Sequence, residues 1–185
     1  MNDIKPVIFL FPVIALVLVA SLYIFLLKKA IDKVAFKKMI LVILFLGFIV
    51  NLVWELVQMP LYKDADYTIS HMAFCALASV ADALMVLLIY LVLALIFKKS
   101  FWVQNARWQS FIIVIIVGAI GAILSEMRHL SLGNWAYNDA MPIIPIVNVG
   151  LIPVLQFMVL PSVVYITTNY ILITRHNQSF NNNIK

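Results

Sequence analysis

Three carboxylic acids, Glu55, Asp82 and Glu126, lie within long apolar stretches of the sequence that are otherwise almost free of ionisable residues. A charged side chain at the centre of a bilayer costs about 2.5–3.5 kcal/mol on insertion scales, which makes such a residue a functional candidate. A carboxyl group kept neutral by burial can protonate an alkene or a leaving group. We therefore expect Asp82, Glu55 and Glu126 to be the catalytic residues.

Polar and small residues recur at helical spacing around each acid, which predicts three faces. The first face consists of Asn51, Trp54, Glu55 and Gln58. The second consists of His71, Cys75, Ala78 and Asp82. The third consists of Gly118, Ala122 and Glu126. At 1.5 Å per residue, Glu55 lies about 6 Å and Asp82 about 16 Å below the outer end of its helix.

If these faces converge, they line a polar cavity in the outer half of the bilayer, capped by residues 135–139. The expected substrate-binding residues are Asn51, Trp54, Gln58, His71, His129, Trp135, Tyr137 and Gln156. The alternative is that the amides serve helix packing and that the aromatic residues form an interfacial belt. Pairs such as Glu126 with Arg128 would then be interface ion pairs of little energetic weight.

A metal site is a further alternative, since Glu126-x-x-His129 has the spacing of a carboxylate–histidine ligand pair on one helix face. His71, Cys75 and Glu55 would complete its ligand shell. A two-metal bundle needs two such pairs, however, and the first half of the chain offers Glu55-x-x-Gln58 instead. We assign no metal, and the sequence indicates no particular cofactor.

The composition shows what must position these residues. Of 185 residues, 65% are hydrophobic and 11% charged, with a mean hydropathy of +1.07. Soluble domains carry about 25% charged residues, and a water-soluble fold of this size could not bury so much apolar surface. This excludes a soluble domain. The net charge of +5 does not indicate nucleic-acid binding, because the basic residues form no continuous face.

The expected fold is an all-α, polytopic transmembrane helix bundle forming one domain over residues 1–174. Each of its five apolar stretches approaches the roughly 20 residues needed to cross a bilayer. The predicted spans are Val7–Leu27, Met39–Met59, His71–Phe97, Ser110–His129 and Leu151–Ile173. The proline-punctuated segment Met141–Gly150 is expected to dip into the outer interface without crossing. Residues 175–185 form a polar cytoplasmic tail.

The basic residues orient the chain. Ten of the thirteen fall in the loops around residues 28–38 and 98–107 or in the tail, all on one side of the predicted bundle. By the positive-inside rule, the N-terminus is outside and the C-terminus is cytoplasmic. A multi-pass protein of the cell membrane follows from this pattern.

The two halves of the chain show a possible internal repeat. Gly47 precedes Glu55 by eight residues, as Gly118 precedes Glu126. Further along, Tyr62, Asp82 and Tyr90 in the first half correspond to Tyr137, Gln156 and Tyr165 in the second. Two such units in the same orientation would be related by an axis along the membrane normal. The repeat, which coincidence in a low-diversity sequence would also explain, predicts that Glu55 and Glu126 face one another.

Trp135-Ala-Tyr137 and the proline-rich stretch after it resemble the small carotenoid cyclase subunits, which are multi-helix membrane enzymes. Those families carry an acidic cluster just after a proline. This chain has Pro153-Val-Leu-Gln156, with an amide at that place. We do not assign the chain to that family, because the departure removes the catalytic acid.

The sequence favours a protein that binds or processes a lipid or isoprenoid-like molecule at a polar site in the outer leaflet. A proton- or cation-coupled transporter of small solutes is the alternative, and with five helices it would need a homodimer. A non-catalytic membrane subunit is a third reading, so the sequence leaves open whether the protein is an enzyme. The partners expected are the lipid bilayer and a hydrophobic small molecule, with no nucleic acid.

Overall fold

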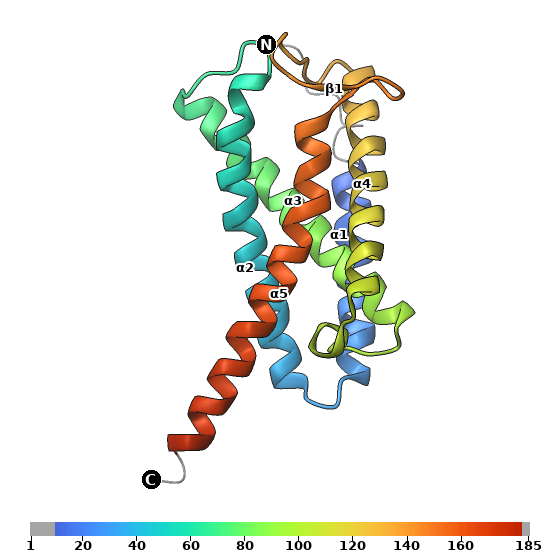
Figure 1. Ribbon diagram of the computed structural model, residues 1–185, viewed down its shortest axis with the longest axis vertical. Coiled ribbons are helices and arrows are strands. Elements are labelled where there is room, and N and C mark those ends of the chain that lie inside the picture. Colours follow the sequence, from blue (N-terminus) through green and yellow to red (C-terminus); the bar gives the residue numbers. More distant parts are fainter. Residues whose placement is uncertain (1–9, 183–185) are drawn as a thin grey trace.

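The computed structural model describes residues 10–182, with side chains from 13 to 172, and its chain folds almost entirely into helices (Figure 1). The helices are α1 (Leu10–Lys29), α2 (Lys33–Gln58), α3 (Ile69–Ile96), α4 (Trp108–Ser131) and α5 (Leu151–Asn182). Two 3₁₀ turns, η2 (Met59–Leu61) and η3 (Trp102–Asn105), lie in the connections. Residues 7–9 of the first predicted span and 183–185 of the predicted tail lie outside the described residues.

Among the described residues, four helical segments are long and apolar enough to cross a membrane. They are Lys33–Leu61, Ile69–Ile96, Trp108–Ser131 and Leu151–Leu172. This indicates a helical membrane protein and agrees with the all-α bundle expected from the sequence. The count of five crossings stays a prediction, since it depends on α1, whose predicted span begins outside the described part.

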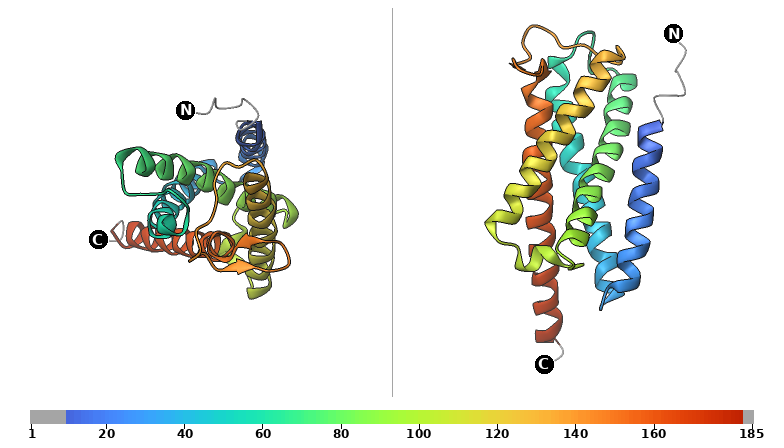
Figure 2. Two further views of the ribbon diagram at one scale, coloured as in Figure 1. Left: turned by 90° about the horizontal axis from the view of Figure 1, so that it is seen from above. Right: turned by 90° about the vertical axis from the view of Figure 1, so that its right-hand side faces the viewer.

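The helices run alternately in opposite directions, so their connections gather at two ends (Figure 1). We call the end formed by residues 59–68 and 132–150 the aromatic end. The basic end carries the connections 30–32 and 97–107. Helix α1 stands at the edge of the bundle, packed against α2 and α3 (Figure 2).

Local capping sets helix bounds that apolarity alone does not. Helix α2 begins at Lys33, six residues before the predicted span, because the Asp32 carboxylate accepts hydrogen bonds from the backbone N–H groups of Val34 and Ala35, both at 2.9 Å. Thr68 caps α3 by accepting from the backbone N–H of His71. At the other end, α5 continues to Asn182, into the stretch predicted as the tail.

The main hydrophobic core lies toward the basic end. Its centre is a group of three buried aromatic rings, Tyr90, Trp102 and Tyr165, whose centroids are 5.5–5.7 Å apart. The Trp102 indole N–H donates to the backbone carbonyl of Tyr90, and the Tyr165 hydroxyl donates to that of Val86. Such rings bury much apolar area while their polar atoms stay bonded. They anchor the 97–107 connection beneath the bundle.

The segment Met141–Gly150 forms a small hairpin and no helix. Strands β1 (Ile143–Ile144) and β2 (Val149–Gly150) pair antiparallel, with Asn148 at a positive φ of 54° in the turn. Met141 and Val149 are buried under it. The hairpin lies over α4 and α5 at the aromatic end (Figure 1), where Leu151 N–H donates to the Pro142 carbonyl and starts α5.

Two glycines bring neighbouring helices into close contact. A Cβ built on Gly118 of α4 would lie 2.0 Å from the carbonyl oxygen of Phe157 in α5. One built on Gly47 of α2 would lie 3.4 Å from the Cβ of Ala83 in α3. Small residues let membrane helices approach backbone to backbone. The bundle is therefore built from two close pairs, α2 with α3 and α4 with α5.

Candidate functional site

A buried amide, Gln156 of α5, connects three of the helices. Its Nε2 atom lies 2.9 Å from Oδ1 of Asn51, 3.1 Å from Oδ2 of Asp82 and 3.3 Å from Oε1 of Glu55. Its Oε1 accepts from Nε2 of Gln58 at 3.2 Å. An amide both donates and accepts, so one side chain can serve all these groups. Gln156 thereby joins α5 to α2 and α3.

Glu55 and Asp82 form a pair of carboxyl groups beside this amide. Gln58 donates to Oε1 of Glu55 at 2.8 Å, and Nε2 of Gln156 lies 3.3 Å from the same oxygen and 3.1 Å from Oδ2 of Asp82. The two carboxyls therefore share one amide as a hydrogen-bond donor. The interactions that dominate around Glu55 and Asp82 come from amides and other carboxyls, and not from a lysine or arginine.

The third acid, Glu126, is buried on α4 and held from the aromatic end. Its Oε2 accepts from the Trp135 indole N–H at 3.2 Å and from the Tyr137 hydroxyl. It lies close enough to interact electrostatically with Glu55 and Asp82. The three acids predicted as catalytic are thus brought together, as the convergence of the helix faces requires. We call them and the three amides Asn51, Gln58 and Gln156 the polar cluster.

Three aromatic rings cover the polar cluster at the aromatic end. The Tyr62 ring lies 5.5 Å from that of Tyr137 and 6.3 Å from that of Trp135, centroid to centroid. Burial raises the pKa of both tyrosines well above the ordinary value, and the neighbouring Glu126 raises both further. Both hydroxyls therefore stay neutral at physiological pH. This aromatic cover, Tyr62, Trp135 and Tyr137, supplies hydrogen-bond donors without bringing charge.

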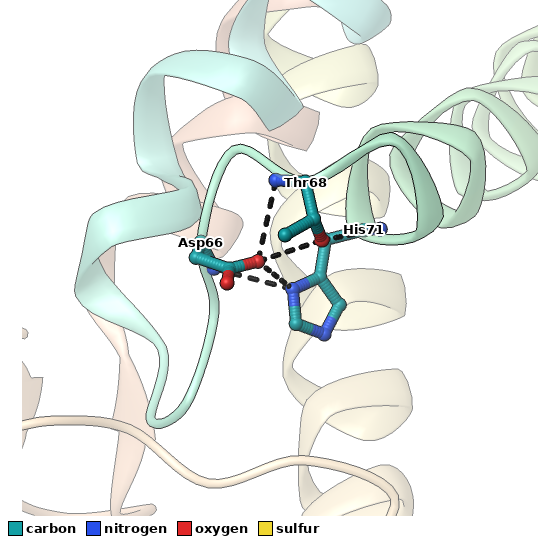
Figure 3. Close-up of polar contacts among 3 residues, drawn as sticks. All are labelled: Asp66, Thr68 and His71. Atoms are coloured by element: carbon teal, nitrogen blue, oxygen red, sulfur yellow. Dashed lines mark hydrogen bonds and ion pairs between the residues drawn. The ribbon is translucent and has the colours of Figure 1, made fainter.

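The two histidines predicted to bind substrate lie differently. His129 stacks on Trp135, with 4.2 Å between ring centroids, and its Nδ1 lies 2.7 Å from Nδ2 of Asn134. His129 therefore packs against Trp135 of the aromatic cover. His71 turns toward the 59–68 connection instead, where its Nδ1 lies 2.5 Å from Oδ1 of Asp66 (Figure 3). The structure brings His71 into no contact with the polar cluster.

Asp66, Thr68 and His71 form a separate exposed group at the start of α3 (Figure 3). The Thr68 hydroxyl donates to Oδ1 of Asp66 at 2.7 Å. Hydrogen bonds from Thr68 and then from His71 hold the pKa of Asp66 below its ordinary value. This group orders the beginning of α3. Over the part of the chain that the structure describes, no three histidine, cysteine or acidic side chains gather in a way that could hold a metal ion.

The remaining predicted residues keep their places on the helix faces. Trp54 donates its indole N–H to Oε1 of Gln58 at 3.2 Å, so it braces the polar cluster from the side of α2. On α3 the buried face runs through Cys75, Ser79 and Ala83, beside the predicted line of Cys75, Ala78 and Asp82. The residue missed by the sequence reasoning on the site is Tyr62. Its correspondence to Tyr137 in the possible repeat was a sequence signal that could have identified it.

Positions that the possible internal repeat would make equivalent lie in contact in the structure. Tyr62 and Tyr137 are antiparallel bridge partners. Asp82 and Gln156 are hydrogen-bonded, and the rings of Tyr90 and Tyr165 lie 5.5 Å apart. Two units related by a two-fold axis bring equivalent residues together only near that axis. These three contacts agree with what such a repeat would require.

An apolar groove runs beside the polar cluster, between α2 and α3. It has a volume of about 350 Å³ and is lined by Leu52, Leu56, Ile69, Met72, Ala73 and Ala76. Ile69 and Met72 are exposed on the side of the bundle. Glu55 and Cys75 belong to the same helical turns as these lining residues, and they lie within electrostatic reach of each other. The groove thus lies along the helical turns that carry Glu55 and Cys75.

Comparisons of this chain with models of protein families, with curated proteins and with solved structures find no match. The class that the fold and site define is a helical membrane protein whose polar cluster, with three carboxyl groups, lies under an aromatic cover.

Proposed function

We propose that this is a multi-pass protein of the cell membrane that binds, and chemically processes, a lipid or isoprenoid-like molecule. The apolar part of the ligand would lie in the α2–α3 groove, and its polar or unsaturated end would reach Glu55 and Asp82. The observation that carries the proposal is the position of the groove, which lies along the turns of α2 and α3 that hold Glu55 and Cys75. A ligand dissolved in the bilayer would enter there without crossing water.

The proposed chemistry is proton donation from the Glu55–Asp82 pair. Either carboxyl, when protonated, would donate its proton to a bound alkene or leaving group. Gln156 and Gln58 bond the same carboxyls, so the charge left after transfer would be met by existing donors. Glu126, bonded to Tyr137 and Trp135, would return the proton or position the ligand.

The orientation forms part of the proposal. The start of α2, at Lys33, and the connection 97–107, with Lys99 and Arg107, lie at the same end of the bundle (Figure 1). By the positive-inside rule, this basic end is cytoplasmic, so the aromatic end and the N-terminus are outside. The polar cluster would then lie in the outer half of the membrane.

A proton- or cation-coupled carrier is the second candidate, favoured by the contacts between repeat-equivalent residues. Parallel repeats about an axis along the membrane normal occur in transporters. Five helices are few for alternating access, so this function would need a homodimer. A non-catalytic membrane subunit, docking other helices through its polar faces, is the third.

The groove is tested by filling it. Ala76→Phe places a ring among the lining residues, whereas Val57→Phe adds the same ring at an exposed position of α2 outside the groove. Lipids that co-purify with each full-length variant in detergent are identified by mass spectrometry. We expect a specific hydrophobic molecule with the wild type and Val57→Phe, and its loss with Ala76→Phe. Equal retention by both variants would overturn the proposed binding groove.

The acid chemistry is tested separately with Asp82→Asn and Glu55→Gln, which keep the shape of each side chain. Both variants should retain the bound molecule but leave it unconverted when the protein is expressed in cells. Conversion at the wild-type level in both variants would refute a role for the carboxyls. Uptake in liposomes that depends on a proton gradient, with no bound lipid, would favour the carrier.

A further inference from the structure

A second groove, separate from the polar cluster, lies at the basic end between the 97–107 connection and the start of α4. It has a volume of about 330 Å³. Its lining combines two cations, Lys99 and Arg107, with the polar side chains of Gln109 and Ser110 and the apolar side chains of Phe97 and Ile113. Ligand pockets in proteins begin at about 300 Å³. The groove therefore has the size and mixed lining of a small-molecule site.

The backbone places Lys99 at this groove. Helix α3 ends in a Schellman motif, in which Lys98 adopts a φ of 54° and the Lys99 N–H bonds to the Ala94 carbonyl at 3.1 Å. This sharp reversal sends the chain under the bundle instead of away from it. Trp102, buried at 3% exposure in the aromatic core, then holds the connection in place. The two cations are thus held by an ordered structure and do not lie on a free loop.

The start of α4 adds to the positive field. Arg107 precedes the helix in an extended conformation, and its side chain makes no capping hydrogen bond. The first N–H groups of a helix carry partial positive charge and favour an anion. Lys99 and Arg107 are exposed, and no carboxylate belongs to the residues that line this groove. The groove has no internal anion to balance its charge.

We propose that this groove binds the headgroup of an anionic glycerophospholipid. Its phosphate would lie between Lys99 and Arg107, where the hydroxyl of Ser110 and the amide of Gln109 can donate. The apolar wall of Phe97 and Ile113 would take the beginning of an acyl chain. Basic pockets beside transmembrane helices recognise anionic lipid headgroups in this manner. A soluble phosphate compound would leave the apolar wall without a role.

The test measures lipid retention by the full-length protein. Protein in neutral detergent is mixed with equal amounts of phosphatidylglycerol and phosphatidylcholine, and the retained lipids are counted by native mass spectrometry. We expect the wild type to prefer phosphatidylglycerol. Each lysine or arginine near a membrane surface strengthens binding to anionic lipid about fivefold, so Lys99→Gln with Arg107→Gln should lower that preference more than about tenfold.

The matched control is Lys37→Gln with Lys38→Gln, which removes the same charge from exposed residues of the first turns of α2, away from the groove. It should keep the preference. An equal loss in both double variants would overturn the site, because it would show general attraction to a basic surface. No preference in the wild type would overturn it as well.

Two further measurements keep the proposal falsifiable. Gln109→Glu places a carboxylate in the groove and should abolish the preference, whereas Gln104→Glu, exposed and outside the lining, should not. Excess inorganic phosphate or glycerol 3-phosphate should fail to displace the lipid. Displacement by either would show that the groove takes a soluble phosphate, and would overturn the lipid assignment.

Discussion

Tyr62 and Tyr137 meet as partners in an antiparallel bridge between two distant connections. The Lys63 N–H donates to the Ala136 carbonyl at 2.8 Å, and the Asn138 N–H donates to the Leu61 carbonyl at 3.0 Å. The side-chain amide of Asn138 also donates to the Pro60 carbonyl. These bonds join the α2–α3 connection to the segment after α4. They fix the aromatic cover over the polar cluster.

The bond from Tyr137 to Glu126 can be tested by removing one hydroxyl. Tyr137→Phe leaves the buried Glu126 carboxyl without one of its donors, which should lower the free energy of unfolding by about 1–3 kcal/mol. Tyr67→Phe is the control, because the exposed Tyr67 hydroxyl donates at 3.2 Å to the Leu56 carbonyl. It should cost less than about 0.5 kcal/mol. Thermal unfolding in detergent measures both, and equal effects would contradict the bond.

The close contact of α4 with α5 predicts a large difference between two glycines on one helix. Gly118→Ala forces a Cβ against the Phe157 carbonyl and should destabilise the protein by about 3 kcal/mol. Gly121 has open space around its missing side chain, so Gly121→Ala should be neutral or stabilise by up to about 1 kcal/mol. Chemical unfolding in mixed micelles compares them. A tolerated Gly118→Ala would show that the helices separate easily.

Much of the bundle follows from the sequence, because apolar length and helical periodicity are local properties. The face predicted on the fourth span, Gly118 with Ala122 and Glu126, is the buried face of α4. The stripe predicted on the second span likewise forms the α2 side of the polar cluster, with Asn51, Glu55 and Gln58. In lipid, few polar residues have any alternative to facing the bundle interior.

What the sequence could not predict depends on contacts outside the helices. His71 continues the helical face of Asp82, yet Asp66 and Thr68 in the preceding connection bind it instead. The hairpin within Met141–Gly150 arises from pairing that no helical period reports. The exact depth and partners of Gln156 follow from the positions of three helices at once. Helical periodicity predicts which residues share a face of a helix. It does not predict which hydrogen bonds their side chains make.

The Asp66 group predicts a pH dependence of stability. The pKa of Asp66 is lowered in the folded protein, so its carboxylate stabilises the fold above the unfolded-state pKa. That contribution is lost as the pH falls below about 4, through the lower folded-state pKa. The wild type should therefore exceed Asp66→Asn in melting temperature at pH 6, and this difference should shrink below pH 4. A difference that stays constant down to pH 2.5 would refute it.

The amide of Gln156 should contribute to stability through its bonds to α2 and α3. Gln156→Leu introduces an apolar side chain of similar size and removes the donor that bonds Oδ1 of Asn51 and Oδ2 of Asp82. We expect a loss of about 1–3 kcal/mol in the free energy of unfolding. Gln104→Leu, at an exposed position of η3, should change it by less than about 0.5 kcal/mol. A neutral Gln156→Leu would mean that packing alone joins the helices.

The turn at Lys98 predicts a stabilising glycine. A non-glycine residue in the left-handed region costs about 1–2 kcal/mol, and glycine avoids this cost. Part of the gain is offset by the greater freedom of glycine in the unfolded chain, so Lys98→Gly should stabilise by roughly 0.5–1 kcal/mol. Lys37→Gly, within α2, should instead destabilise by about 1 kcal/mol. The melting temperatures of the two variants should shift in opposite directions.

The close backbone contact at Gly118 also limits how the helices can move. Because α4 and α5 touch there backbone to backbone, and α2 touches α3 closely at Gly47, neither pair can slide internally without losing its packing. We therefore expect each pair of helices to move as one rigid unit. We expect any opening of the molecule to rotate one pair of helices against the other. The hydrogen bonds from Gln156 of α5 to Asn51 of α2 and Asp82 of α3 would hold the two pairs together.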